Sequence, residues 1–289
     1  MAVPLPARPE IERIYQRLNE LLRSDAHLSR PITYYRALSN LLASAQPLAA
    51  LPLETRRAAP GRLAAGKPMM GSDPLEFNRP AAELFFHKVC DMLEEFEPGA
   101  QQAAAALDAG RLEIAPLLAC LVSGPLDALE AAGEAAEVGS LTLRVALEYT
   151  LRPTLRAWVL QLLDVVSLAD WQQPTCPVCG SPPLLVEFYK SRKLRRLRCG
   201  FCGAGWAFPI KKCVHCANED PDSQSLIADH DDERMFAQTC KRCNSYIKSI
   251  FTEEPLPHDL LSLEDLATLY LDQGCQSRGY HRAATPEEI

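Results

Sequence analysis

Eight of the eleven cysteines in this sequence occur as pairs with two residues between the partners. A C-x2-C pair presents two thiolates from one tight turn. Two such turns that face each other make a tetrahedral four-thiolate cage, which suits zinc or a single iron ion. The sequence therefore predicts two metal sites, built from the pairs Cys176/Cys179, Cys199/Cys202, Cys213/Cys216 and Cys240/Cys243.

The simplest partition of these pairs follows sequence order. In the first set 19 residues separate Cys179 from Cys199, and in the second 23 residues separate Cys216 from Cys240. Both gaps fit a β-hairpin between two metal-binding turns, although the second is slightly long for the usual zinc spacing. A swapped partition, in which the two central pairs share one ion, stays open at this point.

Glycine follows the second cysteine in CPVCG (176–180) and in CGFCG (199–203). A glycine there lets the backbone turn and point amide N–H groups at sulfur, which thiolates need because a four-thiolate site carries excess negative charge. Two other interpretations are weaker. Thioredoxin-like redox chemistry needs one C-x-x-C at a helix start in a βαβ setting, and isolated buried cysteines would not fall into four pairs.

Composition narrows the class of protein. The chain has 289 residues, 47% of them hydrophobic and 23% charged, which is typical of a globular protein with a buried core. The net charge of −7 argues against general nucleic-acid binding. We see no apolar run long enough to cross a membrane and no export signal at the N-terminus, so we expect a cytoplasmic protein without membrane insertion. A reducing compartment favours metal binding over disulfides.

Residues 1–170 are predicted to form an α-helical domain because apolar residues recur there at steps of three and four. The expected helices cover residues 11–22, 34–42, 75–96, 100–109, 111–121 and 141–168, the last with Ser140 as its N-cap. Residues 46–80 are rich in proline and glycine and are expected to be mainly irregular. Pro153 is expected to kink the last helix or to start a new one.

The residue pattern changes after Trp171. Turn-forming residues become more frequent, and short strand-like runs lie near the cysteine pairs. These runs cover residues 184–189, 193–198, 206–209, 235–239 and 245–251. We therefore expect two four-cysteine ribbons, residues 171–211 and 212–289, the second ending in a helix over 263–271 capped by Ser262. The fold class is α+β.

Two charged segments accompany the cysteines. The run KSRKLRRLR (190–198) carries six positive charges, and residues 219–233 are rich in Asp and Glu. The basic run indicates a nucleic-acid contact, a solvated strand that offsets thiolate charge, an acidic partner, or pairing with the acidic segment. We expect His215 to be a solvent-facing turn residue rather than a ligand, and Cys90, Cys120 and Cys275 to be small buried hydrophobes. No catalytic motif is present, so we expect no enzyme.

Several stretches together resemble the FdhE family of formate dehydrogenase accessory (formation) proteins. They are CPVCGSPP (176–183), LRRLRCGFCGAGW (194–206), CVHC (213–216), TCKRCNSYIKSI (239–250) and DLATLYLDQGCQSRGYHR (265–282). The resemblance covers about residues 175–285, and before that point it rests on length and helical character.

The resemblance implies a cytoplasmic, chaperone-like maturation factor that binds the molybdenum-containing catalytic subunit of formate dehydrogenase before export. It also implies that the two four-cysteine sites are rubredoxin-like and bind one iron each, with zinc as the alternative. A rubredoxin-like electron carrier and a nucleic-acid-binding zinc-ribbon protein are the alternative functions.

Overall fold

The computed structural model describes residues 8–24, 26–71, 73–124, 127–189, 194–228 and 234–282. The chain divides into two units. The first comprises the described residues up to Pro60 together with Met69–Val165, and the second comprises Gly61–Pro68 and the described residues from Val166 onward. The expected domain borders at 170/171 and 211/212 stay predictions.

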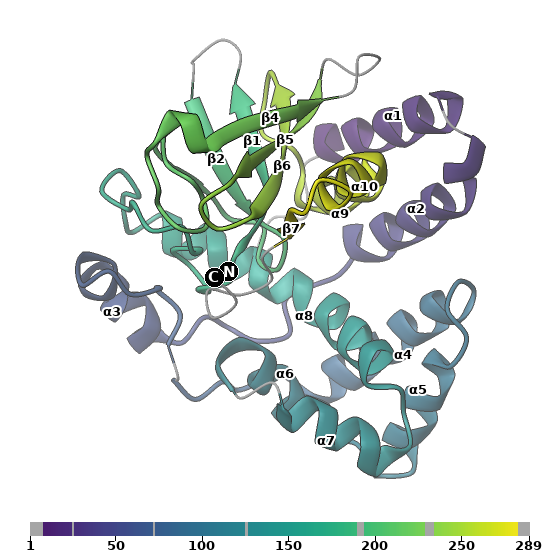
Figure 1. Ribbon diagram of the computed structural model, residues 1–289. Helices are drawn as coiled ribbons and strands as arrows, with labels where there is room; N and C mark the ends of the chain where they lie inside the picture. Colours follow the sequence, from purple (N-terminus) through teal and green to yellow (C-terminus); the bar gives the residue numbers. More distant parts are fainter. Residues whose placement is uncertain are drawn as a thin grey trace. The chain divides into compact units, whose positions relative to one another are not determined.

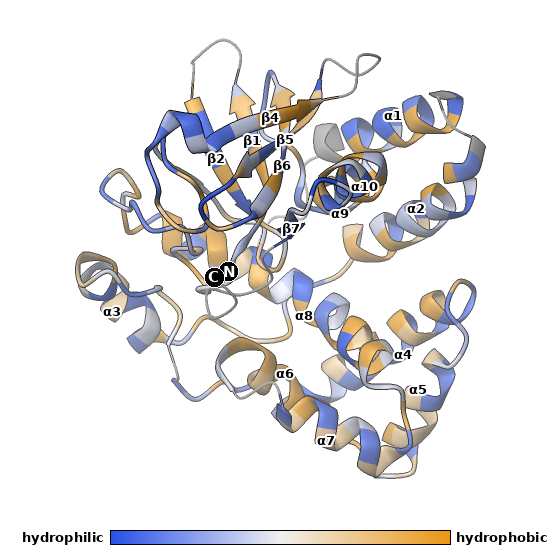
Figure 2. Cartoon of the chain, viewed as in Figure 1, coloured by the Kyte–Doolittle hydropathy of each residue, from blue (hydrophilic) through white to orange (hydrophobic). Residues whose placement is uncertain are grey.

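The first unit is helical (Figure 1). Its helices are α1 (Arg8–Ser24), α2 (Ser29–Ala43), α3 (Leu53–Ala64, which runs past the border of the unit), α4 (Arg79–Glu94), α5 (Ala100–Asp108), α6 (Ile114–Ser123), α7 (Asp127–Ala136) and α8 (Ser140–Leu163). In Figure 2, α6 is coloured hydrophobic along nearly its whole length, whereas α1 alternates between hydrophobic and hydrophilic residues. This alternation is expected of a helix that buries one side only.

Helix α8 is the centre of this unit and contacts α4, α5, α6 and α7. Leu143, Leu147, Leu151 and Leu155, spaced four apart, are fully buried along it. Pro153 lies within α8, so the helix neither ends nor restarts there. Burial on several sides compensates for the backbone hydrogen bond that proline removes.

Two further differences from the expected helices concern residues 46–80 and the helix start near residue 75. Residues 53–64 form α3, with Thr55 and Ala59 buried, although Pro60 lies inside it. Helix α4 begins only at Arg79, because the side chain of Asn78 accepts a hydrogen bond from the amide N–H of Ala81 and caps the helix.

The second unit contains one seven-stranded sheet rather than two separate ribbons. Its strands are β1 (Pro183–Tyr189), β2 (Leu194–Cys199), β3 (Gly205–Ala207), β4 (Gln224–Ala228), β5 (Met235–Cys240), β6 (Ser245–Thr252) and β7 (His281–Arg282). The order is β3-β2-β1-β6-β5-β4, and β7 also pairs with β6. Neighbouring strands are antiparallel except for the β1–β6 and β6–β7 pairs, which are parallel.

Helices α9 (His258–Leu266) and α10 (Leu269–Gln276) pack beside this sheet (Figure 1). Met235 and Ile250 of the sheet form a core with Leu271 of α10. The single helix expected over 263–271 is therefore wrong, since Ser262 lies inside α9. Helix α9 begins at His258, five residues before the expected start at residue 263. It follows directly after Pro257, which fixes the backbone before the helix.

The α+β prediction is confirmed, with helices first, a sheet that holds two four-cysteine clusters, and helices near the C-terminal end. Among the described residues, no helix is long and apolar enough to cross a membrane.

Candidate metal centres

The structure groups the paired cysteines in sequence order, so the central pairs do not share a site. One cluster contains Cys176, Cys179, Cys199 and Cys202, and the other contains Cys213, Cys216, Cys240 and Cys243. Each cluster combines a pair from a loop with a pair that begins at the end of a strand, since Cys199 closes β2 and Cys240 closes β5. The sheet therefore fixes half of each cluster.

All four pairs share one backbone geometry. The residue after the second cysteine has a left-handed φ in every case, +83° at Gly180, +77° at Gly203, +55° at Ala217 and +52° at Asn244. In the first three turns this residue also donates its amide N–H to the carbonyl of the first cysteine, at 2.9 Å from Gly180 to Cys176. Glycine adopts this conformation without strain, which explains the CPVCG and CGFCG motifs.

The sulfur positions match a tetrahedral ion. Within each cluster the four Sγ atoms lie within 4.8 Å of one another. The Sγ–Sγ distances are 3.5 Å for Cys176–Cys202 and 3.6 Å for Cys179–Cys199 in the first cluster. In the second cluster the Cys213–Cys243 and Cys216–Cys240 distances are both 3.8 Å. Four thiolates about 2.3 Å from one ion at tetrahedral corners lie about 3.8 Å apart.

Backbone amides surround the sulfurs as thiolate ligands require. The amide N–H of Val178 donates to Cys176 Sγ, and that of Cys202 donates to Cys199 Sγ, both at 3.4 Å. In the second cluster Asn218 Nδ2 donates to Cys240 Sγ at 3.8 Å. Burial raises the pKa of Cys240, but hydrogen bonds from the backbone N–H groups of Cys243 and Arg242 and from the Asn218 side chain lower it to about 7.

Other sulfurs depend on a cation for their charge. Burial raises the pKa of Cys176, Cys202 and Cys213 above the usual value for a thiol. A buried thiol with a raised pKa stays protonated unless a cation lies beside it, and a divalent ion at the centre of the cluster would keep it charged. The donor set and its geometry therefore fit zinc or iron.

The two clusters differ in their exposure. In the first, only Cys179 is partly exposed, whereas in the second both Cys216 and Cys243 are. The first cluster is covered by His258, whose Nε2 donates to the carbonyl of Gly200 at 2.8 Å. The second cluster is therefore the more accessible to solvent.

Two of the three described arginines of the basic run do not face solvent. Arg195 is buried and donates to the carbonyls of Pro209 and Lys212 and to Gln238 of β5. Arg198 is buried against Glu187 at 2.7 Å. The expectation of a solvated strand is wrong at these positions. Lys190, Arg192 and Lys193, and the acidic residues Asp229, Asp231, Asp232 and Glu233, lie outside the described residues.

His215 is not solvent-facing either. Its Nε2 donates to the carbonyl of Tyr246 at 3.2 Å, and the side chain is half-buried. It belongs to neither cluster. Trp206 is buried beside the first cluster and donates to the carbonyl of Gln173.

Sequence reasoning missed a buried ion-pair network between the sheet and the helices α9 and α10. Lys248 in β6 is fully buried and contacts Asp265 at 2.9 Å and Asp272 at 2.6 Å. Arg282 of β7 binds Asp265 through both of its Nη atoms. The seven-residue spacing of Asp265 and Asp272 in DLATLYLD is the only signal for it, and that spacing is common in exposed helices.

The fold and these centres define a class, an α+β protein with two four-cysteine clusters on one sheet that can each hold a metal ion. A family model for the FdhE C-terminal domain matches residues 211–287. FdhE homologues are 37% identical over 116 residues in Aquifex aeolicus and 29% identical over 294 residues in Edwardsiella ictaluri. The chain is similar to proteins of the FdhE family, most clearly over residues 211–287.

The extent of these matches varies. The chain covers 40% of the Aquifex aeolicus relative and 42% of one from Pseudomonas aeruginosa, about two fifths of their length, but 88% of the Edwardsiella ictaluri relative. The crystal structure of the FdhE protein from Pseudomonas aeruginosa superposes over 100% of this chain and 99% of that one, with a TM-score of 0.65 and 22% identity. At that identity the match establishes the fold alone.

Proposed function

We propose that this chain is a cytoplasmic, chaperone-like accessory protein for formate dehydrogenase and that it binds the catalytic subunit before export. The observation that carries the proposal is the pair of four-cysteine clusters held on one sheet in a chain similar to proteins of the FdhE family. Because the clusters are set in a rigid sheet, they can present a fixed surface to a client. The role we propose is binding, not catalysis.

The ligands we propose are the eight paired cysteines, four to each ion, with iron in both sites. Iron held by four thiolates can carry one electron, whereas zinc is redox-inactive and only structural. The sulfur geometry suits both metals, so the choice rests on the family and is decided by metal analysis of the purified protein.

The test is an anaerobic pull-down of the tagged chain against a formate dehydrogenase catalytic subunit, with metal analysis of the same sample. The double variant Cys199→Ser, Cys202→Ser removes two ligands of the first cluster, and Cys120→Ser is the control because that cysteine lies outside both clusters. We expect the double variant to lose one metal ion and the subunit, and the control to keep both. Full metal content in the double variant would refute the ligand assignment.

A rubredoxin-like electron carrier is the second candidate, because two sulfurs of the second cluster, Cys216 and Cys243, are partly exposed. Two iron ions per chain with no retained catalytic subunit would favour the electron carrier, and bound zinc would rule it out. The nucleic-acid alternative loses much of its basis, because Arg195 and Arg198 are buried in hydrogen bonds within the chain.

A further inference from the structure

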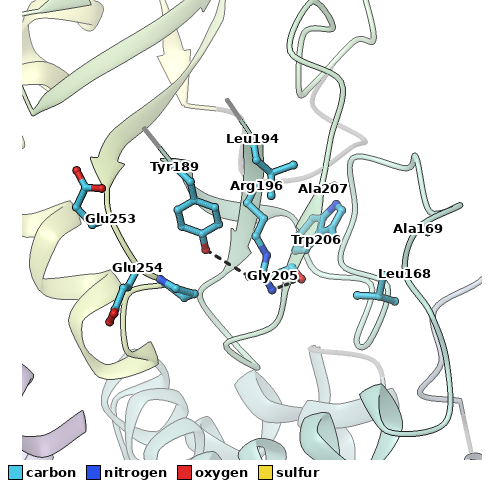
Figure 3. A pocket seen from close by; sticks show the side chains of 11 residues that line it. Leu168, Ala169, Tyr189, Leu194, Arg196, Gly205, Trp206, Ala207, Glu253 and Glu254 are labelled. Carbon is cyan, nitrogen blue, oxygen red and sulfur yellow. Dashed lines mark hydrogen bonds between the residues drawn. The ribbon is translucent and has the colours of Figure 1, made fainter. Parts of the chain in front are cut away.

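A pocket of about 440 Å³ lies in the second unit beside β3, which is an end strand of the sheet (Figure 3). Ligand pockets in proteins commonly measure roughly 300–1,000 Å³. No cysteine of either cluster lines it. Its walls combine apolar, aromatic and charged residues: Leu168, Tyr189, Leu194, Arg196, Trp206 and Glu253.

The free side of β3 opens into this pocket. The amide N–H of Phe208 donates to the carbonyl of Arg195 at 3.2 Å, and that of Cys199 donates to the carbonyl of Ala204 at 2.9 Å. Backbone groups alternate in direction along an antiparallel strand. Gly205 and Ala207 therefore direct their N–H and C=O groups away from β2, and both line the pocket. The carbonyl of Gly205 already accepts from Arg196, so the N–H of Gly205 and both backbone groups of Ala207 are the template for an added strand.

Arg196 is held in place at this edge. Its Nη2 donates to the carbonyl of Gly205 at 2.8 Å and its Nη1 to the hydroxyl of Tyr189 at 3.3 Å, as the dashed lines in Figure 3 show. That hydroxyl in turn donates to the fully buried Glu187 at 2.9 Å. A Cβ at Gly205 would lie 2.9 Å from Arg196 Nε, so the guanidinium packs on the bare glycine.

The guanidinium is therefore pre-organised before any ligand arrives. Within the described residues two hydrogen bonds occupy it, and a guanidinium has five N–H donors. The remaining donors can bind the carbonyl oxygens of an incoming chain.

Two acidic side chains of the pocket favour a positively charged ligand. The exposed carboxylates of Glu253 and Glu254 line it, on the other side of Arg196 from Leu168 in Figure 3. The whole chain carries a net charge of −7, which further favours a cationic ligand.

We propose that this pocket binds an extended basic peptide segment of a partner protein, added as a strand along the free edge of β3. A lysine or arginine of the segment reaches Glu253 and Glu254, and an apolar side chain contacts Trp206 and Leu168. The inference goes beyond the proposed function, because it holds whichever protein supplies the segment and whichever metal fills the clusters.

The test is fluorescence anisotropy on the full metal-loaded chain with a fluorescein-labelled nonapeptide of alternating valine and lysine. The matched peptide carries glutamate in place of lysine. We expect the lysine peptide to bind and the glutamate peptide not to bind.

Two variants test the site itself. Reversing the pocket charge with Glu253→Lys and Glu254→Lys should weaken binding at least about tenfold. The control, Glu130→Lys with Glu134→Lys, reverses two exposed carboxylates of α7 and changes the net charge equally. Ala207→Pro removes an outward N–H of β3 and should also weaken binding, and circular dichroism and metal content verify that it folds.

Equal weakening by the pocket and control pairs would mean that only the net charge attracts the peptide, which would overturn the proposal. Full binding by folded Ala207→Pro would rule out strand addition, and absence of binding would rule out the site. No formate dehydrogenase takes part, so these outcomes are separate from those of the pull-down.

Discussion

Gly203 is the most constrained glycine of the metal-binding turns, and Gly203→Ala tests why. Its φ is +77°, and a Cβ built there would lie 2.7 Å from both Cγ and Nδ1 of His258. The left-handed conformation costs a non-glycine residue about 1–2 kcal/mol. The buried His258 ring must also move, which breaks its hydrogen bond to the carbonyl of Gly200, worth about 1 kcal/mol. We expect a total loss of about 2–3 kcal/mol in the free energy of unfolding of the second unit.

The control is Gly279→Ala. Gly279 has nearly the same φ, +81°, but a Cβ there meets nothing within 4 Å, so only the backbone cost applies. Urea unfolding of both metal-loaded variants, followed by tryptophan fluorescence, gives the two losses for comparison.

We expect Gly203→Ala to lose more stability than Gly279→Ala and to release metal at lower urea. Equal losses in the free energy of unfolding would refute the reasoning, because the contact with His258 would then contribute nothing to the effect of the substitution.

Three further predictions follow from single residues. Ala217→Gly should stabilise the second unit by up to about 1 kcal/mol in urea unfolding, because Ala217 has a φ of +55°, and a loss of stability would contradict the strain argument. Asp272→Asn should cost about 3 kcal/mol in the same assay, because it weakens the charge partner of the fully buried Lys248, and a loss below about 1 kcal/mol would mean that Asp265 alone suffices. Burial raises the pKa of Cys275 to about 11, so its reactive thiolate is scarce at pH 8 and increases only as the pH approaches 11. Alkylation at pH 8 read by mass spectrometry should therefore modify the partly exposed Cys120 first, and early labelling of Cys275 would disprove its burial.

Local spacing was sufficient to predict the clusters and most of the helices. Two thiolates three residues apart on a tight turn have few arrangements, so the position of each pair in the sequence nearly determines its geometry. Helix α8 was predictable because its leucines recur every four residues. Strand β4 was not, because its residues Gln224–Ala228 are only partly buried or exposed and show no alternation.

Long-range pairing was beyond the reach of the sequence pattern. Nothing local indicates that β1 pairs in parallel with β6, since Val186 and its partner Ser249 are 63 positions apart. The two helices near the C-terminal end were also merged into one. Apolar residues continue through both, and the break between them depends on Thr268, whose hydroxyl donates to the carbonyl of Glu264.

The basic run shows how composition misleads when charges are buried. From the sequence its arginines indicate a surface for a partner, but Arg195 of β2 donates to the carbonyl of Lys212, one residue before the second cluster begins. It also reaches Gln238 of β5. Arg195 therefore connects the two halves of the sheet instead of facing solvent.

This connection changes what two clusters on one chain can do. Glu187 of β1 accepts hydrogen bonds from Arg198 Nη1 and from the amide N–H of Leu256, which lies beyond β6. Arg282, near the C-terminal end, donates to the carbonyl of Leu184, next to the first cluster. Each half of the sheet thus supplies hydrogen bonds that the other half needs, and metal binding at one cluster stabilises the strands that position the other. Two independent ribbons would bind their metals without influence on each other, whereas in one sheet the loss of one metal lowers the affinity of the other cluster without emptying it.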